Sequence, residues 1–278
     1  MTTRSVRRTH RIPRTARVAG AGAAALLALS ACSSSSDTDS DSAGASSSSS
    51  SGKLSGQVTV FAAASLKESF TTLGETFEKQ HPGTEVTFNF AGSDTLAASI
   101  TGGAPADVFA SASPKTMATV TDAGATAGTP ATFVRNQLEI ATLPGNPEHI
   151  SSLKDLTDSG LKVVLCDRTV PCGAAARKAL DAGGLDLTPV SYEQDVKAAL
   201  TKVELKEADA AVVYKTDVKA AGGKVTGVDF PESAKAVNDY PITLLKDAPN
   251  ADAARAFVEL VKSAEGQRVL TGAGFRTP

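Results

Sequence analysis

The sequence predicts an α/β fold with largely parallel sheets. Short segments rich in Val, Ile, Phe and Leu alternate along the chain with segments whose apolar residues recur every three or four positions. Two of the strand-like segments also pass through small residues directly into a helix. Since such folds bind ligands at the carboxyl ends of their strands, the turns that follow the strands are the candidate site.

The expected elements follow one another in the order strand, helix, strand, helix. The strand-like segments are 57–62, 85–90, 107–110, 137–142, 162–166, 210–214 and 240–245. The helix-like segments are 66–80, 95–100, 114–121, 173–182, 194–200 and 252–263. In the first of these helices, Leu66, Phe70, Leu73 and Phe77 share one face, which indicates core packing.

Residues 1–31 predict an export signal rather than part of the fold. Six arginines and no acidic residue precede an apolar stretch at 18–31, which is too short to span a bilayer as a stable helix. The stretch ends in LSAC at 29–32, which resembles a bacterial lipobox, so we expect cleavage before Cys32 and a lipid anchor on its sulfur. An ordinary cleaved signal is the alternative, and Arg7-Arg8 leaves twin-arginine export open.

A Ser-rich segment at 32–54 offers little apolar surface, so we expect a disordered tether between the anchor and the folded part. Removal of the six signal arginines changes the formal net charge from −2 to −8. An acidic exported domain is a poor candidate for binding nucleic acid, and we expect no such partner. Any anion must then be captured by local dipoles rather than by the overall field.

Two cysteines remain beside Cys32, namely Cys166 and Cys172, six positions apart. In an exported protein such a pair favours a disulfide, with two free thiols as the alternative. A metal site is disfavoured because the exported part contains only two histidines, His81 and His149, each in a loop next to proline. We therefore expect no side chain that binds a metal directly.

Hydroxyl groups stand at three points where an anion could be hydrogen-bonded. Ser65 and Ser93 each open a helix after a strand, where free backbone N–H groups and the helix dipole favour negative charge, and Tyr214 ends a strand. Helix capping alone is the simpler explanation for the serines. No P-loop, GxGxxG, GxSxG or HExxH pattern is present, and neither histidine is placed to activate Ser65, so we expect no enzyme activity.

The segment 58–66 (VTVFAAASL) resembles the opening strand and turn of molybdate-binding proteins of ABC importers. Further matching segments follow in the order of that family: 90–97 (FAGSDTLA), 103–112 (GAPADVFASA), 170–173 (VPCG), 195–196 (DV), 212–214 (VVY) and 239–242 (DYPI). The resemblance covers essentially the whole folded region. Several motifs in one order are much more specific than any one of them alone.

The resemblance implies a two-lobed periplasmic-binding-protein-like fold, with mixed, mainly parallel sheets flanked by helices and a ligand cleft between the lobes. Residues 55–135 and 240–278 would form the first lobe and residues 136–239 the second, with chain crossings near 133–136 and 239–241. The implied oxyanion ligands are the hydroxyls and backbone N–H groups of Ser65 and Ser93, the backbone N–H groups of Cys172 and Val196, and the phenol of Tyr214. All of these groups are neutral donors.

The function implied is capture of molybdate, and also tungstate, outside the membrane for an ABC permease and its ATPase. We expect a monomer without a cofactor, anchored through Cys32 on the extracytoplasmic face of the membrane. A sulfate-binding or other oxyanion-binding protein of the same fold is one alternative. An anion-sensing lipoprotein domain is another.

The sequence departs from the common family pattern at two positions. Asp94 follows Ser93, and its carboxylate would repel an anion unless it points away, for example as a helix cap or as a surface charge at the helix start. Cys172 stands where many relatives have alanine; a disulfide to Cys166 would stiffen that donor loop and leave its N–H free.

Overall fold

The structure, a computed structural model, describes residues 53–278. The predicted signal at 1–31, the predicted lipid attachment at Cys32 and all but the last two residues of the predicted tether lie outside the described residues. Within residues 53–278, no helix combines the length and the apolar character needed to cross a membrane.

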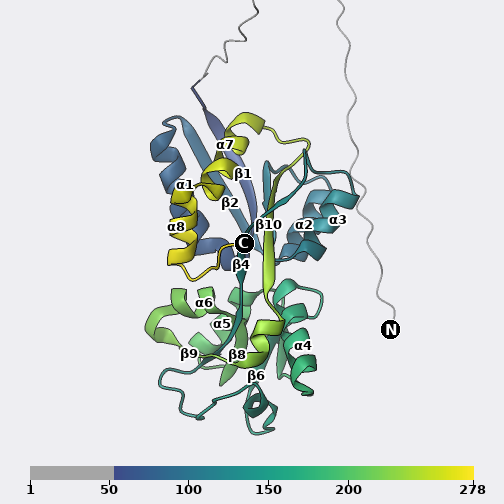
Figure 1. Ribbon diagram of the computed structural model, residues 1–278, viewed down its shortest axis with the longest axis vertical. Helices are drawn as coiled ribbons and strands as arrows, with labels where there is room; N and C mark the ends of the chain where they lie inside the picture. The colour runs from purple at the N-terminus through teal and green to yellow at the C-terminus, as the bar shows by residue number, and fades with distance from the viewer. Residues whose placement is uncertain (1–52) are drawn as a thin grey trace, which may run out of the picture. The chain divides into compact units, whose positions relative to one another are not determined.

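Two five-stranded sheets organise the described chain (Figure 1). In spatial order, the first sheet contains β2 (Thr84–Ala91), β1 (Gly56–Ala63), β3 (Val108–Ala110), β10 (Asn238–Leu244) and β4 (Ala131–Asn136). The second contains β7 (Ser191–Glu193), β6 (Val163–Cys166), β8 (Ala210–Tyr214), β5 (Leu138–Thr142) and β9 (Thr226–Val228). We call each sheet with the helices packed on it the first and the second lobe.

The two sheets repeat one pattern. In each sheet, three parallel strands lie side by side, and the strand that comes first in the sequence is the middle one of this parallel trio. A fourth strand pairs antiparallel with one edge of the trio, and a fifth pairs antiparallel with the fourth. The two-lobed fold with mixed sheets is therefore confirmed, although each sheet holds two parallel and two antiparallel pairings. The antiparallel pairings arise because the strands next to the trio, β10 and β5, directly follow the two crossings between lobes.

Two chain segments connect the lobes. The chain leaves the first sheet at the end of β4 and enters β5 after one residue, Gln137, and it returns at the start of β10. The two segments are neighbours, because Asn136 pairs with Asn238 in the β4–β10 ladder. Figure 1 shows β4 and β10 reaching from the first sheet toward the second lobe.

The first lobe has a hydrophobic core on each face of its sheet. One face is covered by α1 (Lys67–Gln80), α7 (Ala251–Lys262) and α8 (Ala264–Gly272), and the other by α2 (Ser93–Thr101) and α3 (Pro114–Asp122). The predicted apolar face of α1 is confirmed, since the side chains of Leu66, Phe70, Leu73 and Phe77 are fully buried. Phe257 of α7 packs edge-on against Phe70 and Phe77.

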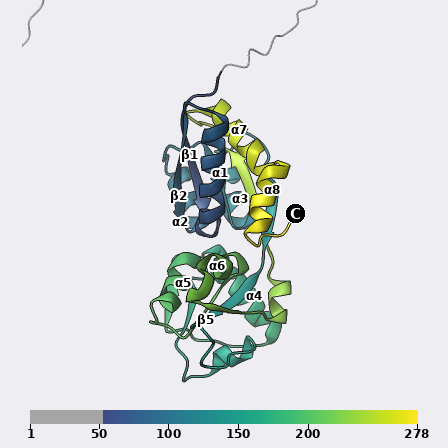
Figure 2. The same cartoon turned by 90° about the vertical axis from the view of Figure 1, so that its left-hand side faces the viewer.

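The second lobe has one continuous core. Three helices surround its sheet: α4 (Pro171–Gly183), α5 (Val196–Glu204) and α6 (Lys215–Ala221) (Figure 2). Short 3-10 helices complete the described chain at Ala64–Leu66, Lys154–Thr157, Gly222–Lys224 and Pro231–Lys235.

The sequence patterns did not predict β4, β7, β9, α6 or α8. The three strands lie at sheet edges, where half-exposed positions dilute the apolar pattern, and β7 and β9 have only three residues each. Helix α6 is short and polar, and α8 contains two glycines that disfavour helix. These elements form because of tertiary packing rather than local preference.

Replacement of Phe70 by alanine tests the packing of the first lobe. Phe70 is fully buried and contacts three other phenylalanine rings, so we expect Phe70→Ala to lower the free energy of unfolding by about 3–5 kcal/mol. Urea unfolding followed by circular dichroism measures this change. Thr71→Ala, at the exposed next position of α1, is the control, and an equal effect of both substitutions would contradict the packing described.

Candidate functional site

A small cavity lies between the two lobes, at the carboxyl ends of both parallel trios. The first lobe lines it with residues that end or follow β1, β2 and β3, and the second lobe with residues that end or follow β6, β7 and β8. The lining residues are Ala63, Ala64, Ser65, Ala91, Gly92, Ser93, Ala112, Val170, Pro171, Cys172, Asp195, Val196 and Tyr214. The space open to the centre of a water molecule is about 20 Å³, which suits one small ion rather than a sugar or a peptide.

All five residues predicted to contact an oxyanion line this one cavity: Ser65, Ser93, Cys172, Val196 and Tyr214. Each is buried. The structure thus brings together five positions that are spread over 150 residues of sequence. Their role as ligand contacts stays a prediction at this point.

The two serines do not act as helix caps. The N-cap of α2 is Gly92 and that of α1 is Leu66, and neither helix start receives a side-chain capping bond. The hydroxyl of Ser93 instead accepts a hydrogen bond of 2.9 Å from the backbone N–H of Ala112, and that of Ser65 pairs with the hydroxyl of Tyr240 at 2.9 Å. The simpler explanation of these serines, helix capping, is therefore wrong.

The second lobe presents two helix N-termini to the cavity. Helix α4 begins with Pro171, which has no N–H, so Cys172 carries the first backbone donor of this helix. Val196 is the first residue of α5, behind the N-cap Asp195, whose side chain accepts from the N–H groups of the two residues after Val196. Both cavity N–H groups belong to the first turn, whose dipole favours an anion.

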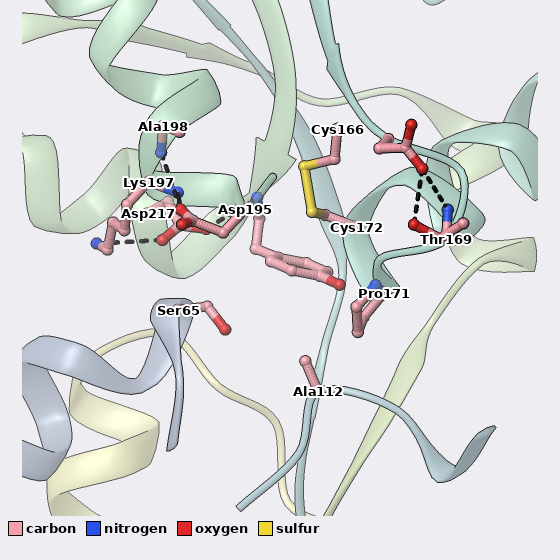
Figure 3. The surroundings of a disulfide bond; sticks show 12 residues. Ser65, Ala112, Cys166, Thr169, Pro171, Cys172, Asp195, Lys197, Ala198 and Asp217 are labelled. Carbon is pink, nitrogen blue, oxygen red and sulfur yellow. Dashed lines mark hydrogen bonds and ion pairs between the residues drawn. A yellow bond between two sulfur atoms is a disulfide. The ribbon is translucent and has the colours of Figure 1, made fainter. Parts of the chain in front are cut away.

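Two features restrain the turn that carries Cys172: a disulfide and a glycine. A disulfide joins Cys166 at the end of β6 to Cys172, with a Cα–Cα distance of 5.8 Å. Gly173 follows, and a Cβ atom there would lie 1.8 Å from the carbonyl oxygen of Asp167, so only glycine fits. Figure 3 shows Ser65 of the first lobe on the opposite side of the site from Cys172 and Asp195.

Internal donors orient the hydroxyl groups of the cavity. The amide nitrogen of Asn238 donates to the Tyr214 hydroxyl at 2.8 Å, as Ala112 does to Ser93. A hydroxyl that already accepts from the protein interior can direct its own proton into the cavity. Tyr214 and Ser93 can therefore act as donors toward the cavity, which stays a prediction.

The same arrangement reaches Ser65 through two steps. The amide nitrogen of Asn136 lies 3.4 Å from the Tyr240 hydroxyl and can only donate to it. Tyr240 and Ser65 share a hydrogen bond of 2.9 Å in which either hydroxyl can be the donor, and when Tyr240 donates, the proton of Ser65 is left for the cavity. Burial raises the pKa of both Tyr214 and Tyr240 above the usual tyrosine value, so both phenols stay protonated.

Asn238 is the functional residue that the sequence analysis missed. Its side-chain nitrogen donates to the carbonyl of Ala112 in the first lobe at 2.8 Å and to Tyr214 in the second. It therefore connects the lobes at the rim of the cavity and fixes one cavity donor. Its position directly before the matching segment 239–242 was the signal available in the sequence.

Asp94 is placed differently from both explanations offered by the sequence. It does not cap α2, because the N-cap Gly92 receives no side-chain bond, and it is half-buried rather than a surface charge. Within residues 53–278, its buried Oδ1 atom has no hydrogen-bond partner. Asp94 is not among the lining residues of the cavity, so its carboxylate does not face a ligand there.

An ion triad stands next to the cavity. Lys197 of α5 lies 2.9 Å from Glu68 of α1 and 3.1 Å from Asp217 of α6 (Figure 3 shows Lys197 and Asp217). Burial raises the pKa of the fully buried Asp217 to about 6, although Lys197 acts in the opposite direction. Burial alone would lower the pKa of Lys197, but Asp217 and Glu68 outweigh it and raise that pKa.

No group of three or more His, Cys, Asp and Glu side chains within residues 53–278 could hold a metal ion. The donors around the cavity are hydroxyls and amide N–H groups, which suit the oxygen atoms of an anion rather than a bare cation. The arrangement can therefore bind a small oxyanion without a cationic side chain at the cavity wall.

Comparison with known proteins places this geometry in a class. Residues 58–276 match the family described as bacterial extracellular solute-binding protein, and the chain belongs to this family. This class consists of extracytoplasmic binding proteins. The match covers both lobes of the described structure.

Named relatives narrow the family further. The molybdate-binding protein ModA of Mycobacterium tuberculosis is 48% identical over 221 residues, which cover 80% of this chain and 85% of the relative. ModA of Haemophilus influenzae is 35% identical over 80% of this chain and 90% of the relative. The chain therefore belongs to the ModA family of molybdate-binding proteins, and the resemblance seen in the sequence is confirmed.

Solved structures agree on the fold. The periplasmic molybdate-binding protein of Azotobacter vinelandii superposes with a TM-score of 0.70 at 21% identity, over 80% of this chain and 99% of that structure. At this identity the likeness supports the two-lobed fold alone.

The raised pKa of Asp217 predicts how stability depends on pH. Because its folded-state pKa of about 6 exceeds the ordinary value of 3.8, the folded protein binds the proton more tightly than the unfolded chain. The stabilisation from this proton is fully present below about pH 4 and is lost as the pH rises through 6. Relative to Asp217→Asn, the wild type should therefore gain about 2 kcal/mol in free energy of unfolding between pH 7 and pH 4.5.

Urea unfolding of the ligand-free proteins across this pH range makes the measurement. Asp122→Asn, at an exposed position, is the control. A constant difference between wild type and Asp217→Asn over the whole range would contradict the raised pKa.

Proposed function

We propose that this chain is an extracytoplasmic lipoprotein that captures molybdate, and tungstate in the same cavity, for an ABC importer. Two ModA proteins of other bacteria, named as molybdate-binding, share 48% and 35% of its sequence over four fifths of the chain. The observation that carries the proposal is the small cavity between the lobes, whose wall offers neutral donors from both sides.

The donor set fits a fully deprotonated tetrahedral oxyanion. Such an ion has four oxygen atoms that accept hydrogen bonds and no proton to donate at neutral pH. The hydroxyls of Ser65, Ser93 and Tyr214 and the N–H groups of Cys172 and Val196 supply neutral donors from the two lobes. Hydrogen phosphate brings a proton that needs an acceptor, so the same wall disfavours it.

Closure of the lobes is the mechanical step of capture. The cavity wall is complete only when both lobes meet, because each supplies the ends of one parallel trio. We assign residues 55–135 and 240–278 to the first lobe and 136–239 to the second, so that closure bends the chain at its two crossings. The permease would engage the closed, loaded form, and its ATPase would drive release.

The remaining features of the proposal concern the place and state of the protein. A lipid on Cys32 would hold it at the outer face of the membrane, and it would act as a monomer. The named relatives are binding proteins rather than enzymes, and the Ser65 hydroxyl pairs with a tyrosine rather than with a base.

Calorimetric titration of the purified protein with molybdate, tungstate, sulfate and phosphate tests the proposal. We expect tight binding of molybdate and tungstate and no heat with phosphate. Sulfate has the same charge and tetrahedral shape as molybdate but is smaller. Its exclusion therefore depends on the size of a cavity that fits the larger molybdate ion. Tight binding of sulfate with none of molybdate would favour the sulfate-binding alternative, and no binding of any oxyanion would contradict the proposal.

Gly92 offers a direct test of closure. A Cβ atom at this position would lie 2.6 Å from the backbone oxygen of Gln194 in the other lobe, which cannot give way without parting the lobes. Overpacking of this kind costs about 1–3 kcal/mol, so we expect Gly92→Ala to weaken molybdate binding about 10-fold or more. The backbone of Gly92 has φ of −56°, which any residue adopts, so the first lobe itself should fold normally.

The matched control is Gly128→Ala, where a Cβ atom would meet nothing within 4 Å. Calorimetry gives the affinities, and thermal unfolding of the ligand-free proteins shows whether the fold is intact. Wild-type affinity in Gly92→Ala would contradict the closed geometry.

A further inference from the structure

The ion triad beside the cavity joins the two lobes. Glu68 lies on α1 of the first lobe, and the Nζ atom of Lys197, on α5 of the second lobe, lies 2.9 Å from each of its carboxylate oxygens. Among the described residues, this is the one ion pair that spans the lobes away from the crossings, where Arg135 and Asp239 pair between the neighbouring strands β4 and β10. It exists only while the lobes are together.

Within the second lobe, Lys197 forms an ion pair with Asp217. Asp217 lies 3.1 Å from its Nζ atom and is fully buried, so the ammonium group has a fixed partner whether or not Glu68 is near. The other carboxylate oxygen of Asp217 accepts from the backbone N–H of Tyr214 at 3.2 Å. Asp217 therefore fixes the position of the Lys197 ammonium group before the first lobe approaches it.

Each member of the triad is close in sequence to a residue of the cavity wall. Lys197 directly follows Val196, Glu68 lies three positions after Ser65, and Asp217 three positions after Tyr214. Glu68 and Lys197 also line a groove that shares Ala64 and Asp195 with the cavity. The pair thus stands at the outer edge of the site and does not touch its interior.

We propose that Lys197 and Glu68 form a latch that holds the closed lobes together and thereby sets how long the oxyanion stays bound. When the lobes part, Glu68 returns to water and Lys197 keeps Asp217, so breaking the latch leaves no buried charge unpaired. The latch acts on release more than on capture, because the open protein that meets the ligand does not contain it. This inference rests on the proposed function, since it names what controls release from the same site.

Glu68→Gln removes the charge across the cleft and leaves the pair of Lys197 and Asp217 intact. Glu68 is about half exposed, with 49% of its side chain accessible, so the substitution should not disturb the fold. We expect radiolabelled molybdate to leave Glu68→Gln about 3- to 10-fold faster than the wild type, with little change in the association rate. Glu68→Lys sets two like charges across the cleft and should release faster still.

Glu75→Gln, an exposed carboxylate of the same helix, is the matched control and should release molybdate at the wild-type rate. Raising the ionic strength to about 0.5 M should speed release from the wild type more than from Glu68→Gln, which a purely structural role of Glu68 would not produce. Thermal unfolding of the ligand-free variants checks that all of them fold.

The outcomes separate the two claims. If the wild type binds molybdate and both Glu68 variants release it at the wild-type rate, the latch is overturned and the proposed function stands. If the wild type binds none of the four oxyanions, the proposed function fails and the latch falls with it. Faster release with a smaller salt effect in Glu68→Gln supports both.

Discussion

The whole arrangement depends on holding an anion with neutral donors. A dianion that meets no cationic side chain must receive all of its stabilisation from N–H and O–H groups that are aimed before it arrives. In the proposed function, strand ends from two similar sheets surround one point, and the hydroxyl oxygens of Tyr214 and Ser93 accept hydrogen bonds from Asn238 and Ala112. Where these hydroxyl oxygens accept from the protein, their protons are available to an anion in the cavity.

This solution also fits the charge of the protein. Without the six arginines of the predicted signal, the chain would have a formal net charge of −8, and its overall field would not attract an anion. Selectivity therefore has to come from a buried site in which each hydrogen bond counts for more than it would in water. The ammonium group of Lys197, next to the site, is paired with two carboxylates and adds no free positive charge.

The sequence predicted the parts of the structure that local patterns determine. The strands of both parallel trios except β7, the buried face of α1 and the serine turns are visible in apolar spacing and small residues, and five cavity positions followed from the resemblance to one family. The role of Asn238 was not predictable, because it depends on a contact with Tyr214, 24 residues away in sequence, and with Ala112, 126 residues away. Asp94 was misjudged for a similar reason: no helix-start rule shows that its carboxylate lies half-buried beside the turn at Gly92.

The position of β1 has a consequence for how the molecule moves at a surface. β1 starts at Gly56, next to the beginning of the described chain, and ends at Ala63 beside the cavity, a run of about 25 Å at the usual rise per residue. Any attachment made through the preceding residues would therefore pull on the first lobe at the start of β1, the end of this strand that is far from the cavity (Figure 1). The second lobe is joined to the rest of the described chain only through the first, by two neighbouring segments, so a pull on the start of β1 reaches the second lobe only through these crossings.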